Sequence, residues 1–480
     1  MRIKAIWIFL SPQKGKLANR GITVMICSDR PFWPFLGRSF MKPFLTIALA
    51  AAIIILPSNA VAATLEVGPD KNFKTIEYAY QQAKEGDTIV VYPRYGNQPY
   101  ERSALRVGKK SITFRAAEPG VRISGKGFDY SGEYPVPRAI FQFDKGADNC
   151  VVEGFELFNA HNETYNGAGV RINMANNIRI TGCDIHDNDM GIMSIGDGTG
   201  HTGVNQIIER CRIHDNGLSD SPHFHHNLYL DGESATVSFC EIYKSRRGHN
   251  LKSRAHFMLV QYCYVHDSAD REFDFVDGKE TERPESDAVL IGNIIVKDPG
   301  CKGNLQVIYF GQDGKGFRDG TLYLVHNTIV TAFSSPVIML SSPEAKADLV
   351  GNFICDGGNG DGGQSIADAM GSAQLKNVSG EFNVFGRRFA PQAATRLAGT
   401  NTFGYGKTFP FKDPRKNDYR PKHPLPYAWP AKLMTLPKLP SPLKYKGKKP
   451  ISWQYKYPAD GEERPYEERL TVGAYSYTGN

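Results

Sequence analysis

A repeat with a period of 23 to 34 residues is the feature that most restricts how this chain can fold. Eight phrases align from residue 151 onwards, each a short run that alternates apolar and polar residues. They are VVEGFELFNA, IRITGCDIHDN, IIERCRIHDN, TVSFCEIYKS, MLVQYCYVHDS, VLIGNIIVKD, LYLVHNTIVT and DLVGNFICDG. One aligned position holds Phe155, Cys183, Cys211, Cys240, Cys263, Asn293, Asn327 and Asn352.

Each repeat also holds a second run of the same kind, such as HNLYLDG, HNLKSRA and EFDFVDG. A unit of two or three short strands cannot bury a core alone, but units stacked as coils share one core. We therefore expect an all-β chain that folds as a parallel β-helix, with like residues of successive coils about 4.8 Å apart. Residues 74–84 have helical periodicity and predict a short helix that caps the N-terminal end.

Seven cysteines follow residue 63, and four of them occupy the aligned position of the repeat. Stacked positions of parallel coils rarely offer disulfide geometry, and the close pairs of ligands that zinc requires do not occur. We therefore predict free, buried thiols and no metal ligands among these cysteines.

The opening FKTIEYAYQQAKEGDTIVVYP, the repeats, and the ending DYRPKHPLP with RLTVGAYSY carry a family resemblance. They are similar to the right-handed parallel β-helix proteins of the pectate lyase superfamily, from Thr64 to Tyr477. The resemblance implies a right-handed solenoid that acts outside the cytoplasm on polysaccharides, mostly acidic ones. The superfamily also contains hydrolases, esterases, epimerases and phage tailspikes, so the fold alone names no reaction.

Residues 42–63, KPFLTIALAAAIIILPSNAVAA, are typical of a secretory signal peptide. An apolar run from Phe44 to Leu56 precedes the small-residue cleavage signal Ala60-Val61-Ala62. We expect residues 1–63 to be an upstream extension plus this signal, with the true start at Met41, and the mature protein to be periplasmic or secreted. The alternative is a membrane anchor, but a bilayer span needs roughly 20 apolar residues, so we expect no integral membrane segment after cleavage.

The charge balance of the remaining chain does not favour a nucleic-acid partner. Residues 1–63 hold eight of the 57 Lys and Arg residues and one of the 50 Asp and Glu residues, which leaves 49 of each. Residues 401–480 are rich in Pro and Lys and hold 15 basic and 7 acidic side chains. Their aromatic residues favour packing along the outside of a β-helix domain of residues 64–400 over a disordered linker.

GHNLKSRA, residues 248–255, is unusual because it places two cations on one face of a predicted strand. Side chains alternate along a strand, so Asn250, Lys252 and Arg254 share the outer face. This coil spans 23 residues from Cys240 to Cys263, whereas the coils before and after it span 29 and 30. A short coil between longer ones, with insertions at 217–226 and 276–287, predicts a groove with Lys252 on its floor.

Stacking the neighbouring coils extends this face into a polar patch. The predicted outward column through Lys252 is Arg171, Met193, Tyr229, Lys252, Asp274, Tyr309 and Met339. We predict substrate-binding roles for His225, His226, Asn227, Asp231, Asn250, Glu272, Asp274, Arg171 and Tyr309. Three further histidines, His186, His214 and His266, recur in the IHD or VHD phrase of the repeats and indicate a structural turn ladder.

The patch suits β-elimination from an acidic polysaccharide. That reaction needs a cation on the uronate carboxylate, a base for the neighbouring proton and a donor for the leaving oxygen. Arg254 is suited to bind the carboxylate, and Lys252 is the candidate base if Arg254 lowers its pKa. Tyr229 or His249 would donate or shuttle the proton.

The LKS phrase with its nearby arginine is similar to the Lys and Arg pair of the chondroitinase B and alginate lyase group. That likeness implies lysine as base and arginine as acid. The sequence departs from the group because both residues lie two apart on one strand, and the acidic calcium ligands of the group are not matched.

Other functions remain open at this point. A C5-epimerase would use the same proton abstraction, and a glycoside hydrolase would use Asp231, Asp274 or Glu272 as acid and base. A non-catalytic polysaccharide-binding protein, or a solubilising ladder of salt bridges, would also explain the patch. A calcium ion near Glu272, Asp274 and Asp277 is conceivable, although a solvated acidic turn explains these residues as well.

Overall fold

The computed structural model describes residues 62–218, 225–357, 363–397, 399–406, 410–425, 428–430, 451–465 and 469–477. The predicted upstream extension, and the signal peptide up to Val61, lie outside these residues. Among the residues described, no helix is long and apolar enough to cross a membrane.

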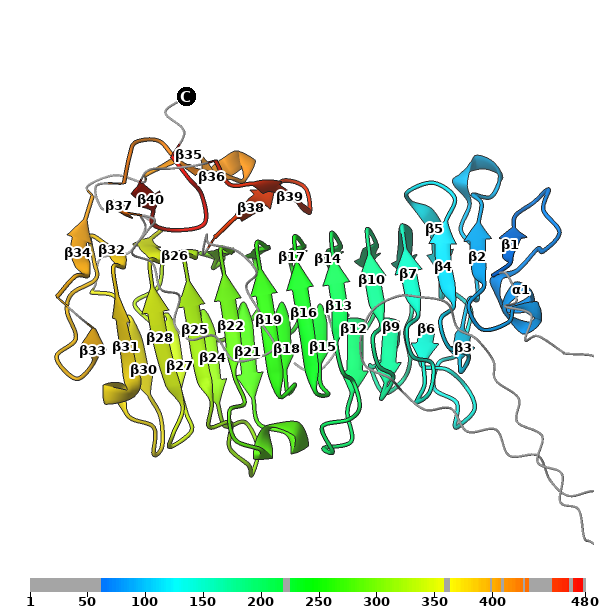
Figure 1. Ribbon diagram of the computed structural model, residues 1–480, viewed down its shortest axis with the longest axis horizontal. Helices are drawn as coiled ribbons and strands as arrows, with labels where there is room; N and C mark the ends of the chain where they lie inside the picture. The colour runs from blue at the N-terminus through cyan, green and yellow to red at the C-terminus, as the bar shows by residue number, and fades with distance from the viewer. Residues whose placement is uncertain are drawn as a thin grey trace, which may run out of the picture. The chain divides into compact units, whose positions relative to one another are not determined.

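Three parallel sheets, here called A, B and C, run the length of residues 64–405 (Figure 1). Sheet A comprises β1 (Thr64–Val67), β2 (Thr88–Val91), β4 (Thr113–Ala116), β7 (Val151–Glu153), β10 (Arg179–Thr181), β13 (Gln206–Glu209), β16 (Ser234–Ser238), β19 (Phe257–Gln261), β22 (Ala288–Ile291), β25 (Thr321–Val325), β28 (Lys346–Val350), β31 (Val378–Glu381) and β33 (Arg396–Leu397). Sheet B comprises β5 (Val121–Ser124), β8 (Phe155–Phe158), β11 (Asp184–His186), β14 (Arg212–His214), β17 (Glu241–Tyr243), β20 (Tyr264–His266), β23 (Ile294–Val296), β26 (Thr328–Thr331), β29 (Phe353–Asp356), β32 (Val384–Gly386) and β34 (Thr402–Tyr405). Sheet C comprises β3 (Leu105–Val107), β6 (Ala139–Phe143), β9 (Ala168–Asn173), β12 (Met190–Ile195), β15 (Leu228–Leu230), β18 (Leu251–Ser253), β21 (Phe273–Val276), β24 (Ile308–Gly311), β27 (Ile338–Leu340) and β30 (Ala367–Ala369).

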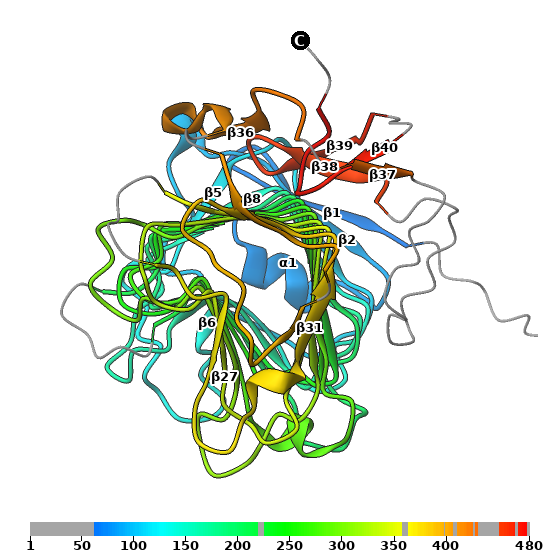
Figure 2. The ribbon, with the colours of Figure 1, turned by 90° about the vertical axis from the view of Figure 1, so that its left-hand side faces the viewer.

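The predicted all-β, right-handed parallel β-helix is confirmed, because the chain contributes one strand to each sheet per coil. The helix α1 (Ile76–Gln82) lies at the end of the stack that β1 and β2 form (Figure 2). It is shorter than the predicted 74–84 because Thr75 caps its start and Ala83 has an extended backbone. Short 3-10 helices are η1 (Tyr95–Asn97), η2 (Lys279–Glu282), η3 (Leu375–Asn377) and η4 (Pro414–Lys416).

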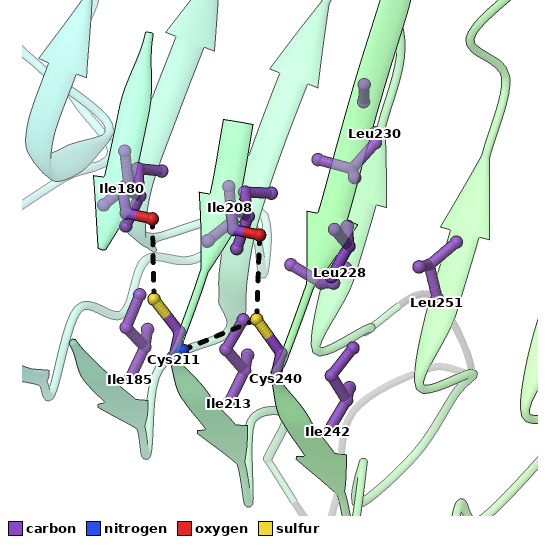
Figure 3. Packing of buried hydrophobic residues seen from close by; sticks show 14 of the residues in the cluster. Ile180, Ile185, Ile208, Cys211, Ile213, Leu228, Leu230, Cys240, Ile242 and Leu251 are labelled. Atoms are coloured by element: carbon purple, nitrogen blue, oxygen red, sulfur yellow. Dashed lines mark hydrogen bonds between the residues drawn. The ribbon is translucent and has the colours of Figure 1, made fainter. Parts of the chain in front are cut away.

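Aliphatic side chains from all three sheets fill the interior of the coils. Ile208 on sheet A, Ile213 on sheet B and Leu228 on sheet C are fully buried and belong to one cluster (Figure 3). Burying a side chain of this size contributes roughly 1.5–3 kcal/mol relative to leaving it exposed. The apolar residues of the alternating pattern in the repeats therefore form the core.

The predicted ladder of free, buried thiols is also confirmed. The sulfur of Cys240 accepts a hydrogen bond from the Cys211 amide at 3.4 Å (Figure 3). Further along the stack, Oδ1 of Asn293 accepts from the Cys263 amide at 2.9 Å. The chain turns from sheet A to sheet B at this position, where it needs an acceptor for a buried amide, and thiol and amide side chains both supply one.

The C-terminal residues form three antiparallel pairs: β35 (Phe411–Asp413) with β36 (Asp418–Pro421), β37 (Ala428–Pro430) with β40 (Arg469–Thr471), and β38 (Trp453–Lys456) with β39 (Asp460–Glu463). Phe411, Tyr419 and Tyr455 are buried in one cluster with Tyr264 of sheet B. The hydroxyl of Tyr264 and Oδ1 of Asn417 are 3.0 Å apart. Residues 431–450 of the Pro- and Lys-rich segment lie outside the described part.

Candidate functional site

The predicted column on sheet C has the register that the repeats indicated. Parallel pairing joins Arg171 to Met193, Met193 to Tyr229, and Tyr229 to Lys252. It continues from Lys252 to Asp274 and then through Tyr309 to Met339. Residues 81 positions apart in sequence, Arg171 and Lys252, thus stand on one face of one sheet.

A cleft of ≈ 640 Å³ lies over this face, where the sequence predicted a groove. It is lined by Thr164, Tyr165, Asn166, Met190, His226, Tyr229, His249, Lys252, Arg254, Asp270, Arg271, Asp274, Asn304 and Asp313. The insertion 276–287 does not contribute to this lining, and residues 219–224 of the other insertion lie outside the described residues. The walls come instead from loops near residues 165, 304 and 313.

Lys252 and Arg254 hold a single carboxylate oxygen between them. Oδ2 of Asp313 lies 2.7 Å from Nζ of Lys252 and 2.9 Å from Nη2 of Arg254. Asp313 comes from the loop that follows β24, and its side chain is partly exposed. The two cations therefore form a carboxylate clamp, a name used below for Lys252 and Arg254.

Asp274, on the neighbouring strand β21, forms an ion pair with Lys252 of the clamp. Its Oδ2 lies 3.0 Å from Nζ of Lys252 and 3.3 Å from Nε2 of His249, and its Oδ1 accepts from Nη1 of Arg271 at 2.8 Å. Burial would raise the pKa of Asp274, but the interactions with His249, Lys252 and Arg271 outweigh burial and lower it. Asp274 is thus a buried carboxylate that holds Lys252 in place.

The expectation that Arg254 lowers the pKa of Lys252 is wrong. Burial does lower the pKa of Lys252, but the carboxylates of Asp274 and Asp313 outweigh burial and raise it above its ordinary value. Lys252 therefore remains protonated, which suits charge neutralisation and not proton abstraction.

The hydrogen bonds of His249 and His226 define which ring nitrogen carries the proton. Nδ1 of His249 accepts from the Arg271 amide at 3.1 Å, so the ring proton is on Nε2, which lies 3.3 Å from Oδ2 of Asp274. Nδ1 of His226 accepts from the His249 amide at 3.0 Å, which leaves its Nε2–H for a ligand in the cleft. Burial, with His249 and Lys252 nearby, lowers the pKa of His226 well below its ordinary value, so the ring is neutral.

Tyr229 places its hydroxyl beside the clamp. Nε of Arg254 donates to the phenolic oxygen at 2.9 Å, while Nη1 of the same guanidinium donates to the carbonyl oxygen of Asp277. The ring stacks with that of His226 at a centroid distance of 5.8 Å. The hydrogen bond from Arg254 holds the phenolic oxygen beside the clamp, where Tyr229 can exchange a proton with a bound sugar.

The structure does not place Asn227, Asn250 and Glu272 on the outer face. All three are fully buried at the turn from sheet B to sheet C. Nδ2 of Asn227 donates to Oδ1 of Asn250 at 2.8 Å, and Nδ2 of Asn250 donates to Oε2 of Glu272 at 2.6 Å. Because they precede their strands, strand alternation does not set their direction, and they form an internal ladder instead of substrate contacts.

Four further predicted binding residues do not line the cleft. His225 is buried, and the Tyr309 hydroxyl donates to the carbonyl oxygen of Gln312 at 2.5 Å. Asp231 accepts from the Gly232 amide at 2.7 Å, and burial raises its pKa to about 6. Arg171 lines a separate hollow further along sheet C.

The three carboxylates considered for calcium do not converge. Glu272 faces the internal ladder, Asp274 faces the clamp, and Asp277 accepts from the backbone amides of Gly314 and Gly316 at 2.9 and 3.0 Å. The described residues contain no group of three His, Cys, Asp or Glu side chains arranged for a metal ion. Asp277 instead anchors the loop that carries Asp313.

Asp313, Arg271 and Asn304 are among the cleft residues that the sequence did not reveal. Arg271 lies over the Tyr309 ring at 4.3 Å and donates to Asn304 at 3.3 Å. All three lie in loops outside the repeated strands. The one available signal for Asp313 was its glycine-rich context, GQDGKG, directly after a strand of the predicted column.

No protein-family model and no curated protein sequence matches this chain. Among solved structures, pectate lyase Pel9A is similar at 12% identity, covering 87% of this chain and 96% of that chain with a TM-score of 0.45. An alginate lyase from Paenibacillus sp. str. FPU-7 is similar at 15% identity, covering 71% and 99% with a TM-score of 0.38. The mannuronan C-5 epimerase AlgE4 A-module of Azotobacter vinelandii shares 11% identity, covering 69% and 91% with a TM-score of 0.38. At such low sequence identities and TM-scores, these structures say nothing about the reaction, which has to be inferred from the cleft.

Proposed function

We propose that this protein is a periplasmic or secreted polysaccharide lyase that cleaves a uronate-containing polymer by β-elimination. One observation carries the proposal: Lys252 and Arg254 both contact the same carboxylate oxygen of Asp313. A site that holds an aspartate carboxylate from a partly exposed loop can hold a uronate carboxylate of substrate in the same way. In this proposal Asp313 leaves the clamp when substrate enters.

Neutralising the uronate carboxylate acidifies the proton on C5. The phenolic oxygen of Tyr229, in its anionic form beside Arg254, removes this proton while a double bond forms between C4 and C5. The bond from C4 to the leaving oxygen breaks, and Tyr229 returns the proton to that oxygen. Neutral His226 donates its Nε2–H to a sugar hydroxyl and fixes the ring, because loss of its last ring proton is too costly for acid catalysis.

The geometry does not favour the hydrolase alternative. Asp274 is ion-paired to two neighbouring cations with a lowered pKa, so it does not serve as an acid. Glu272 faces the interior and Asp231 does not line the cleft. A C5-epimerase would share the first step and differ only in where the proton returns.

The test is turnover of alginate, polygalacturonate, hyaluronate and chondroitin sulfate, followed by the ultraviolet absorbance of unsaturated products. We expect Lys252→Met to lower kcat about a hundredfold or more, because the clamp then leaves the developing charge unneutralised. The control is Lys244→Met, since Lys244 is exposed and lies outside the cleft. Equal turnover by Lys252→Met and the wild type would refute the proposal, and proton NMR that shows changed isomer ratios without cleavage would favour the epimerase.

Asp313→Asn tests the displacement step. Removing the competing carboxylate should lower KM several-fold, because the substrate no longer has to displace an ion pair. A raised KM with unchanged kcat would instead show that Asp313 contacts the substrate.

A further inference from the structure

A second hollow, of ≈ 580 Å³, lies over sheet C towards the N-terminal end of the same face. It is formed by β3, β6, β9 and the loop before β6, and four basic side chains line it: Arg106, Arg138, Lys145 and Arg171. Arg106 is paired with Asp144, and Lys145 lies 3.5 Å from Asp197. The other two arginines are not neutralised in this way.

Arg171 is buried at the floor of this hollow, with 8% of its surface exposed. Its Nε donates to Oδ1 of Asn173 at 3.0 Å, and its Nη1 lies 3.1 Å from the sulfur of Met193. Within the described part of the chain, neither Arg171 nor Arg138 forms a salt bridge, and Asp144, which also lines the hollow, is paired with Arg106. Burial and the charge of Arg138 lower the pKa of Arg171 to about 10, so it still carries its charge at neutral pH.

A buried guanidinium without a counter-ion costs free energy unless an anion binds it. Arg171 is buried and Arg138 is half-buried, and together they place two cations in one hollow, which constitutes an anion site. Nη1 of Arg138 approaches Asn166, which lines the neighbouring cleft. The hollow and the cleft thus meet at Asn166.

The strand order fixes how far this site lies from the clamp. Sheet C runs β9, β12, β15, β18, so Arg171 is three strand steps from Lys252, or roughly 14 Å at about 4.8 Å a step. Met193 and Tyr229 occupy the two steps between them. An apolar side chain and an aromatic ring suit the apolar faces of sugar rings between two anionic groups.

We propose that Arg171 and Arg138 form a distal subsite that binds a second uronate or sulfate of the same polysaccharide chain, several sugars from the bond at the clamp. This inference rests on the proposed function for the identity of the polymer. It adds that the polymer lies across the strands of sheet C, towards β6, and that short fragments bind without using the subsite.

The test measures binding and not activity, and it uses the inactive Tyr229→Phe background. Polymer binding is measured by affinity electrophoresis in alginate, polygalacturonate, hyaluronate and chondroitin sulfate. Binding of the matching disaccharides is measured by calorimetry. Arg171→Met and Arg138→Gln should each weaken polymer binding about tenfold or more and leave disaccharide binding unchanged, because a disaccharide does not reach 14 Å beyond the clamp. Arg115→Gln is the control, since Arg115 is an exposed arginine on sheet A.

Arg171→Met should unfold at the same temperature as its parent or higher, because it removes a buried charge that has no partner. This readout separates a binding arginine from a structural one. Polymer affinities that equal the parent's in both variants, or a parent that binds none of the polymers, would overturn the subsite. Arg171-dependent binding without any turnover in the wild type would retain the subsite and refute the proposed lyase reaction instead.

Discussion

Columns of stacked side chains on sheets B and C both place carboxylates beside aromatic or cationic groups, yet among the described residues only the sheet C column lines the cleft that holds the clamp. The column on sheet B stacks Phe158, His186, His214, Tyr243 and His266, with ring centroids 4.5 to 5.4 Å apart. The column on sheet C joins Tyr229, Lys252 and Asp274, none of which repeats on the next coil. The two columns use similar residue types, but they differ in where the partners of their polar groups come from.

On sheet B, the partners of each histidine belong to the ladder itself. Nε2 of His214 lies 2.9 Å from Asp184, and Nδ1 lies 2.8 Å from Asp215. His186 and His266 each contact two carboxylates in the same way. Both ring nitrogens are used within the chain, so these histidines stabilise a turn, as their recurrence predicted.

On sheet C, the polar groups reach beyond their own column. The carboxylate clamp is closed by Asp313 from a partly exposed loop, and the Nε2–H of His226 lies in the cleft. Where a repeat position keeps one residue type, the stacked side chains supply hydrogen-bond partners to one another from coil to coil. Where the residue type changes, polar groups remain whose partner comes from a loop or a ligand. This difference suggests how to distinguish structural residues from functional ones in a solenoid.

Removing one phenol from each column should give the largest contrast. Tyr229→Phe is expected to lower kcat about a thousandfold, because the variant lacks the phenolic oxygen that is proposed to exchange the proton. Tyr243→Phe loses only a hydrogen bond from Arg212 and should retain full turnover. Absorbance assays on the preferred polymer measure both, and comparable activity in Tyr229→Phe would exclude Tyr229 as the proton-transfer group.

Asp274→Asn should cost the most stability. It leaves Lys252, His249 and Arg271 without their shared carboxylate, and removing one partner of a buried ion pair costs about 3 kcal/mol or more. The matched control is Asp348→Asn on sheet A, where the half-buried carboxylate accepts one hydrogen bond from Ser379 and the expected loss is below about 1 kcal/mol. Urea unfolding compares the two, and equal losses would mean that Asp274 does not hold the clamp.

Glu272→Gln should change how stability depends on pH. Burial raises the pKa of Glu272 to about 7 from an ordinary 4.5, so its contribution to stability is full below 4.5 and is lost as the pH rises through 7. The variant lacks this titration, so relative to wild type it should gain about 3 kcal/mol from acidic to alkaline pH. Asp184→Asn on sheet B should show the opposite sign, because His214 and Arg212 lower the pKa of Asp184 against the effect of burial. A Glu272→Gln curve parallel to wild type would contradict the buried ladder.

His214→Gln should have the smallest effect. Burial lowers the pKa of His214, but Asp184 and Asp215 outweigh burial and raise it, so the stabilisation is present below 6.5 and fades as the pH rises through the raised value. We expect a loss of about 1 kcal/mol at acidic pH, little loss at alkaline pH, and unchanged turnover. Reduced turnover at constant stability would show that this column also serves the reaction.

The sequence by itself determined the coils, the register and the buried thiols. The alternation of side chains within a strand and the repeat period together place Arg171, Tyr229 and Lys252 in one column. Both patterns are local in the sequence, and parallel stacking carries them unchanged from one coil to the next. The direction of Asn250 was mispredicted because it precedes its strand, where alternation no longer holds.

The tertiary structure decided the chemistry of the patch. Besides Asp274, the raised pKa of Lys252 depends on Asp313, which lies 61 residues away on a loop that Asp277 fixes through backbone amides. No periodic pattern specifies a loop conformation, and a pKa is set by whichever charges arrive within a few ångströms. The sequence therefore located the carboxylate clamp, and only the fold showed that it already holds a carboxylate.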